Sequence, residues 1–195
     1  MPGFHFLIER SGAPAFIDPQ QTLSFRRAEG IFVAPDRVNA TVRVIAPGMV
    51  AEVSVISIGD VQWETNLLTG EWQELPPDWG FNPGDLFDAE SGIQTALTND
   101  LSDVSLDSIE ELEELPGLRL YRITASMEGD RLSQVSYGMI GPEPVEVVLW
   151  IAPWTYELHR VTFTEPGAQE STMWQIDFWD FDQTVDIEPP THGGG

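Results

Sequence analysis

Residues 38–60 read Val-Asn-Ala-Thr-Val-Arg-Val-Ile-Ala-Pro-Gly-Met-Val-Ala-Glu-Val-Ser-Val-Ile-Ser-Ile-Gly-Asp. Apolar and polar residues alternate from Val38 to Val44, which is the period-2 pattern of a strand with one dry face. Pro47-Gly48 interrupts the pattern, and Gly59-Asp60 ends the apolar run that follows. Two strands separated by a tight turn form an antiparallel hairpin, so this stretch predicts an antiparallel sheet.

Short strand-like runs separated by turn residues continue on both sides of this hairpin. They are expected at 4–10, 22–34, 61–68, 71–75, 104–109, 118–127, 145–152, 156–164 and 172–182. Strands and helices do not alternate regularly, and no internal repeat is visible. About ten or eleven antiparallel strands are therefore predicted.

The middle of the chain has a different periodicity. Leu86, Phe87, Ile93 and Leu97 recur at helical spacing, which predicts one or two short helices within residues 83–101. A further short helix is expected over residues 130–139, with Asp130 at its N-cap.

A sheet of this width twists and curls, and its concave apolar face must be covered. The predicted fold class is therefore mainly β with a few helices (α+β). It is a single curled antiparallel sheet, a half-barrel, with a helical lid over an apolar cavity. Residues 1–190 are expected to form one domain, and residues 191–195 a disordered tail or the remnant of a linker.

Composition excludes several classes of function. The formal net charge is −23, from 32 acidic and nine basic residues, and every basic residue is Arg. Such a field repels nucleic acid and anionic membrane surfaces, so neither is an expected partner. The absence of Lys excludes Schiff-base chemistry and Lys-dependent nucleotide loops. The absence of Cys excludes disulfides and thiol catalysis.

No arrangement of a nucleophile, a base and an orienting group is visible in the sequence. His5 and His159 lie in predicted strands, where a structural role is favoured, and His192 lies in the expected tail. Asp177 and its acidic neighbours could suggest a cation site, but the alternation around them is typical of one wet and one dry strand face. The sequence therefore predicts a binding protein with no catalytic residue, no cofactor and no metal.

The chain resembles the LppX/LprG (LppX_LprAFG) lipoproteins, which share the LolA/LolB half-barrel, over most of residues 4–190. Short motifs in matching order carry the resemblance. They are Phe4-His5-Phe6 with Gly12, Ala28-Glu29-Gly30, Pro35-Asp36-Arg37, Ile58-Gly59-Asp60 with Trp63, Thr69-Gly70-Glu71-Trp72, Leu75-Pro76, Phe81-Asn82-Pro83 with Gly92 and Leu97, Val147-Val148-Leu149-Trp150-Ile151, Leu158-His159-Arg160, and Phe178-Trp179-Asp180-Phe181 with Val185, Ile187 and Pro189.

The resemblance implies an extracytoplasmic carrier that holds acyl chains and serves envelope lipid transport. Its expected partner is a lipid or acylated molecule, with an envelope protein as a further candidate. Family members carry a lipidated Cys and a helix before the first strand, and this chain has neither. Membrane association is therefore expected only through an anchor absent from this chain.

Strand parity and the lid helices give the candidate residues of the lipid cavity. They are Phe4, Phe6, Ile8, Val42, Val44, Val53, Val55, Trp63, Leu86, Phe87, Ile93, Leu97, Leu149, Ile151, Leu158, Trp174, Ile176 and Phe178. A one-residue bulge would move a strand's set to the other face, and ordinary core packing is the alternative role for each residue.

Two other functions remain open at this point. A glycan-binding sheet would use exposed Trp72, Trp79 or Trp154 as stacking platforms. A non-enzymatic envelope sensor would have a filled core and no ligand.

Overall fold

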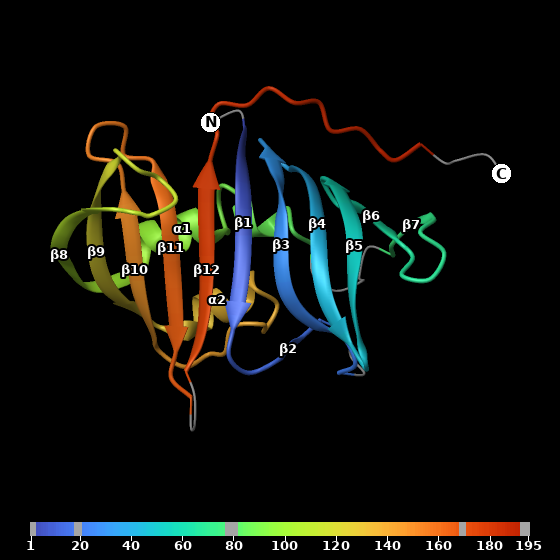
Figure 1. The fold of residues 1–195 in the computed structure, drawn as a ribbon, viewed down its shortest axis with the longest axis horizontal. Helices are drawn as coiled ribbons and strands as arrows, with labels where there is room; N and C mark the ends of the chain where they lie inside the picture. The colour runs from blue at the N-terminus through green and yellow to red at the C-terminus, as the bar shows by residue number, and fades with distance from the viewer. Residues whose placement is uncertain (1–2, 18–20, 77–81, 168–170, 192–195) are drawn as a thin grey trace.

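The computed structural model describes residues 3–17, 21–76, 82–167 and 171–191. Its strands form one open, twelve-stranded antiparallel sheet in the order β7-β6-β5-β4-β3-β1-β12-β11-β10-β9-β8, with β2 paired to β3 (Figure 1). The strands are β1 (Gly3–Ser11), β2 (Ala15–Phe16), β3 (Ser24–Val33), β4 (Arg37–Ala46), β5 (Met49–Ile58), β6 (Val61–Thr65), β7 (Trp72–Glu74), β8 (Leu101–Glu111), β9 (Arg119–Met127), β10 (Val145–Ile151), β11 (Leu158–Glu165) and β12 (Thr172–Trp179). The predicted curled antiparallel sheet is confirmed.

The first and last strands pair at the centre of the sheet. Phe6 of β1 lies opposite Phe178 of β12 on one side and Gly30 of β3 on the other. A side chain at Gly30 would collide with the backbone, because a Cβ there would lie 2.4 Å from the Asn39 carbonyl oxygen. The missing side chain lets β3 and β4 approach closely beneath the aromatic core.

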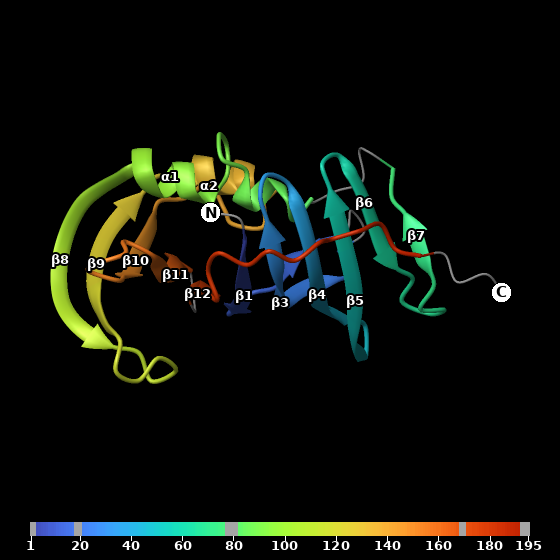
Figure 2. The same ribbon diagram turned by 90° about the horizontal axis from the view of Figure 1, so that it is seen from above.

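Each half of the sheet is a meander of neighbouring strands. β3 to β7 follow β1 on one side, and β11 to β8 continue from β12 on the other, with one long connection, residues 128–144, between β9 and β10. Seen from above, the sheet curves around the short helical segments that lie on its concave face (Figure 2).

These segments are the 3₁₀ turn η1 (Asp85–Phe87) and the helices α1 (Ile93–Asn99) and α2 (Gly129–Val135). The Phe87 ring fixes η1 to the sheet, because it lies within 5.3 Å, centroid to centroid, of the rings of Phe4, Phe6 and Phe32. Tyr137 donates a hydrogen bond to the Asp85 carboxylate and so links the end of α2 to η1.

The boundaries of α2 differ from the prediction. Glu128 occupies the cap position, and Asp130 lies within the first turn. The first helical residue, Gly129, has room for no side chain, because a Cβ there would lie 2.1 Å from the Glu143 carbonyl oxygen. It ends before Tyr137 and Gly138, whose positive φ angles of 53° and 79° leave the helical conformation.

A second, smaller apolar cluster covers the convex face of the sheet. It contains the buried residues Ile31, Ile56, Trp63 and Ile187. The segment after β12 brings Ile187 across the strand ends, and the Arg37 guanidinium holds it by donating to the Ile187 carbonyl oxygen at 2.7 Å. Among the described residues, no helix is long and apolar enough to cross a bilayer.

Candidate functional site

An apolar cavity with a solvent-accessible volume of about 180 Å³ lies between the concave face and the lid segments. Its lining residues come from both wings of the sheet and from every lid segment. They are Phe6, Ile8, Ile17, Leu23, Phe25, Ala28, Ala40, Val42, Val44, Val53, Val55, Gln62, Glu64, Leu67, Leu75, Pro83, Leu86, Ile93, Leu132, Val135, Ser136, Met139, Ile140, Phe163, Trp174 and Ile176.

The main wall is the hairpin whose sequence predicted the sheet. Val42 lies opposite Val53, and Ala40 lies opposite Val55, so both strands present small β-branched or methyl side chains to the same space. Because the side chains on these two neighbouring strands are short, they leave a void that larger side chains would fill. This void is the part of the cavity next to β4 and β5.

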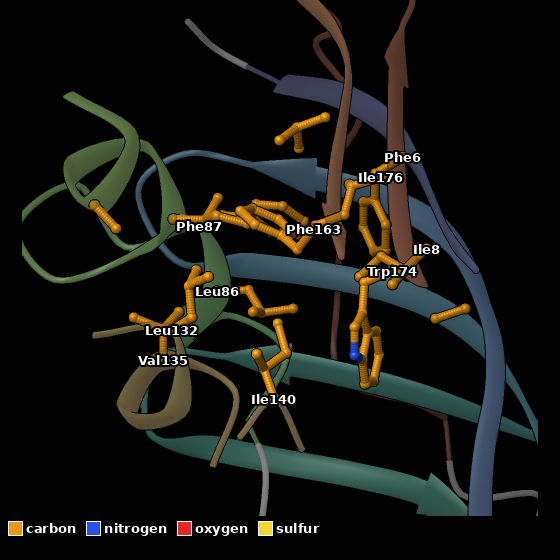
Figure 3. Close-up of a cluster of buried hydrophobic side chains, with 14 of the residues drawn as sticks. Phe6, Ile8, Leu86, Phe87, Leu132, Val135, Ile140, Phe163, Trp174 and Ile176 are labelled. Atoms are coloured by element: carbon orange, nitrogen blue, oxygen red, sulfur yellow. The ribbon is translucent and has the colours of Figure 1, made fainter. Parts of the chain in front are cut away.

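The lid closes the opposite side. Leu86, Leu132, Val135 and Ile140 point toward the sheet side chains Trp174 and Ile176 in the close-up (Figure 3). All six residues are buried and belong to one continuous core cluster. The cavity is thus the unfilled part of the protein's main hydrophobic core.

Trp174 forms part of the floor with its polar edge satisfied. Its indole N–H donates to Glu165 Oε1 at 2.8 Å, and its ring stacks on Phe25 with centroids 5.4 Å apart. Glu165 Oε2 also accepts a hydrogen bond from the Gly141 N–H at 2.7 Å. One carboxylate therefore ties the segment after α2 to the strands beneath it.

The polar lining is confined to a few positions. Gln62 and Glu64 of β6 and Ser136 after α2 are the polar lining residues, and Glu64 accepts a hydrogen bond from the Gln73 side chain at 2.9 Å. Ile17 and Leu67 line the cavity while more than a third of each remains exposed, so they mark its mouth. Glu64 is the one ionisable group among the described lining residues, which suits an uncharged apolar ligand.

Ten of the residues predicted from strand parity and helical spacing lie in this lining. They are Phe6, Ile8, Val42, Val44, Val53, Val55, Leu86, Ile93, Trp174 and Ile176. Seven others lie in or against the same core cluster but away from the void, where they pack against protein. They are Phe4, Phe87, Leu97, Leu149, Ile151, Leu158 and Phe178.

Trp63 differs from its predicted placement. Its neighbours Gln62 and Glu64 line the cavity, so the alternation of β6 puts Trp63 on the convex face, in the cluster closed by Ile187. The prediction placed the apolar side of this strand toward the cavity, whereas in the structure its polar side chains face the cavity.

The structure adds lining residues that the sequence did not single out. Ile17, Leu23 and Phe25 come from the segment before and within β3, and Met139 and Ile140 come from the segment after α2. They lie outside regular periodic stretches or at a bulge of β3, where parity gives no signal.

Polar residues considered for other chemistry have structural partners. Asp177 accepts a hydrogen bond from Arg160 Nε at 2.5 Å on the convex face. His5 stacks on Trp179, and His159 packs its ring edge-on against Phe181. Burial lowers the pKa of His159, which keeps the imidazole neutral near pH 7.

The tryptophans of the glycan alternative have different environments. Trp72 is partly buried against the convex-face cluster, whereas Trp154 is 91% exposed at the turn between β10 and β11. Trp79 lies outside the described residues.

An open, curled antiparallel sheet with a helical lid over an apolar cavity defines the half-barrel class of fold. The chain belongs to the LppX_LprAFG lipoprotein family, whose model matches residues 3–187. Comparison with curated protein sequences gives no match.

Two solved structures share the fold. LprF from Mycobacterium bovis is 13% identical, with a TM-score of 0.72 over 96% of this chain and 89% of LprF. The lipoprotein LppX from Mycobacterium tuberculosis is 15% identical, with a TM-score of 0.64 over 96% of this chain and 90% of LppX. At these identities the likeness extends to the fold.

Proposed function

We propose that this protein is a non-catalytic carrier of the cell envelope that holds the acyl chains of a lipid or acylated molecule in the cavity. One observation carries the proposal: the main core is incomplete at the hairpin β4–β5, and the resulting void is walled almost entirely by apolar side chains. Membership in a lipoprotein family supports the envelope location.

The energetics favour an acyl chain over water as the occupant. A water molecule needs about 10–15 Å³ of such volume and several polar partners, so the cavity has space for roughly a dozen water-sized groups but few groups to bind them. A chain of about ten buried methylenes gains on the order of 8 kcal/mol before association costs.

Ligand entry requires movement of the lid or passage through the mouth. Few polar contacts connect the lid segments to one another. Among them are the hydrogen bond from Tyr137 to Asp85 and the ion pair between Arg131 Nε and the Asp100 carboxylate at 3.7 Å. Such partly exposed contacts contribute little to stability individually, so the apolar contacts of Phe87 and Leu132 set most of the cost of opening.

The test is organic extraction of the purified protein followed by mass spectrometry, with native mass spectrometry of the intact protein in parallel. A stoichiometric lipid, or saturable uptake of a fluorescent acyl probe by delipidated protein, is the expected result. Protein that carries no lipid and takes up no probe, while its thermal unfolding remains cooperative, would refute the carrier function.

A glycan-binding role is the alternative that a specific observation favours. Trp154 and Tyr156 are both largely exposed in one turn, where aromatic rings could stack on sugars. This role predicts that soluble envelope glycans quench tryptophan fluorescence in the native protein and fail to do so in Trp154→Ala.

A further inference from the structure

The convex face of the sheet carries a polar hollow of about 310 Å³. Several of its lining residues come from the last residues of β1 and the first residues of β12, which are the lower ends of these strands in Figure 1. We name it the arginine hollow, and its lining residues are Glu9, Arg10, Ser11, Arg26, Arg27, Arg43, Met173 and Gln175. Four of the nine basic residues of a chain with 32 acidic ones thus gather at one place.

Two of these arginines are neutralised by acidic neighbours on the same face. Arg27 pairs with Glu9 at 3.0 Å and Glu29 at 2.8 Å, and Arg43 pairs with Glu52 at 2.6 Å. These pairs hold the two guanidinium groups in fixed positions along the wall of the hollow.

The other two arginines lack such partners. Six of the nine arginines form ion pairs with carboxylates, and among the described residues Arg10, Arg26 and Arg119 form none. Because acids outnumber bases more than threefold, unpaired guanidinium groups are the exception here. Arg10 and Arg26 are two of the three, and both line the hollow.

Arg10 and Arg26 are also close to each other. Arg26 Nη1 donates to the Arg10 carbonyl oxygen at 2.5 Å. Arg10 is 7% exposed, and its guanidinium lies over the Trp174 ring, 5.1 Å from the centroid, on the cavity side of β1. Its Nε is buried with no hydrogen-bond partner among the described residues.

Charges of both signs lie near Arg10. Burial lowers its pKa, the nearby Glu165 carboxylate opposes that effect, and the Arg26 charge lowers the pKa further. An anion bound at Arg26 would reduce the repulsion between the Arg26 and Arg10 guanidinium groups.

We propose that the arginine hollow binds an oxyanion of the size of phosphate, with Arg26 as the main donor and Arg27 and Arg43 beside it. A guanidinium group presents five N–H donors in a planar fork that matches phosphate oxygens. The hollow is separate from the acyl-chain cavity, although Arg10 borders the hollow and stacks on Trp174, which lines the cavity.

The net charge of −23 does not prevent such binding. At roughly 0.15 M ionic strength the screening length is about 8 Å, so the local potential is set by the four arginines of the hollow and their carboxylate partners Glu9, Glu29 and Glu52. Charges on distant parts of the sheet contribute little at that range.

The phosphate group could be free or part of a lipid headgroup, and the neighbouring surface bears on this. Three apolar residues, Phe16, Ile45 and Val50, lie side by side across neighbouring strands, because Phe16 pairs with Ser24, Ser24 with Ile45, and Ile45 with Val50. They are on the same face as the paired residues Arg27 and Arg43 and next to them on that face. All three apolar residues are more than 40% exposed. Apolar side chains beside basic ones are the composition that interacts with lipid headgroups and the acyl region below them.

The test compares wild type with Arg26→Gln and with Arg119→Gln. Arg119 is the matched control, because it is also exposed and unpaired among the described residues but lies in β9 on the other wing. Isothermal titration with inorganic phosphate at constant ionic strength is the first arm. Co-sedimentation with phosphatidylglycerol vesicles, against phosphatidylcholine vesicles, is the second.

Saturable phosphate binding that weakens about tenfold in Arg26→Gln and stays within about twofold in Arg119→Gln is the expected result. Binding to phosphatidylglycerol vesicles alone, with the same dependence on Arg26, would support the site and assign the lipid headgroup as its source. No binding in either arm, or equal losses in both variants, would overturn the proposal. Thermal unfolding of each variant establishes that it is folded.

Discussion

Filling the cavity from the β4 wall gives the most direct test of the acyl-chain proposal. Val42 lines the cavity, lies opposite Val53 and Ala28, and is only partly buried, so a larger side chain there extends into empty space. Val42→Phe adds four carbon atoms to the side chain and occupies the volume of about four methylene groups of the ligand.

The size of the effect follows from the transfer free energy of the displaced methylenes. At about 0.8 kcal/mol each, four of them correspond to roughly 3 kcal/mol, or a loss of about a hundredfold in affinity. The protein itself should not lose stability, because the phenyl ring fills a void and no neighbour has to move far.

The assay is titration of delipidated protein with a fluorescent acyl probe, combined with thermal unfolding of the unliganded protein. Thr41→Phe is the control, since Thr41 is exposed on the convex face of the same strand and the substitution has the same bulk. Equal affinities for Val42→Phe and wild type, with both proteins folded, would show that the ligand does not occupy this cavity.

Three further substitutions test contacts that hold the cavity together. Glu165→Ala removes the acceptor of the Trp174 indole N–H and should lower the unfolding free energy by about 1–3 kcal/mol in urea titration. Glu165→Gln keeps an acceptor oxygen and should lower it less. Equal losses in the two variants would mean that this hydrogen bond does not contribute to stability. The pKa of His159 is lower in the folded protein than in the unfolded chain, so the stability that the neutral imidazole contributes is present above about pH 6.5 and is lost as the pH falls through the folded-state pKa. His159→Gln should therefore flatten the pH dependence of the unfolding free energy in this range. An unchanged slope would show that His159 is not the titrating group. Asp177→Ala leaves the largely buried Arg160 without its nearest carboxylate and should destabilise the protein by about 2–4 kcal/mol in denaturant unfolding. Asp177→Asn should cost less. A loss of only a few tenths of a kcal/mol would mean that Glu114 alone compensates the Arg160 charge.

Local alternation in the sequence accounts for how much of the fold was predictable. The hairpin at 38–60 has one dry face, so its strands and the cavity-facing set Val42, Val44, Val53 and Val55 follow from parity. The same argument failed at Trp63, because β6 has apolar packing on its convex side and polar groups toward the cavity. Parity identifies the apolar face of β6 but does not tell whether that face lies toward the cavity or toward the convex side.

The sequence could not show which of the buried residues line the cavity and which pack against other side chains. Phe178 and Trp174 are both buried aromatics on the same face of β12, yet only Trp174 reaches the cavity, because Phe87 packs close to Phe178. Such differences depend on which lid side chain covers which strand, and no local pattern specifies that pairing. The arginine hollow likewise depends on β1, β3, β4 and β12 meeting at their ends.

The pairing of β1 with β12 sets the order in which the sheet can be completed during synthesis. β1 can pair with β3 as soon as the first few dozen residues are available, but its other edge stays open until the last strand is complete. Throughout that interval the half-finished sheet presents an unpaired strand edge flanked by Phe4 and Phe6, the kind of surface that other chains add to. We therefore expect truncation before β12 to yield aggregates and not a smaller folded unit, and we expect a polypeptide destined for translocation to depend on a holding factor until its final residues emerge.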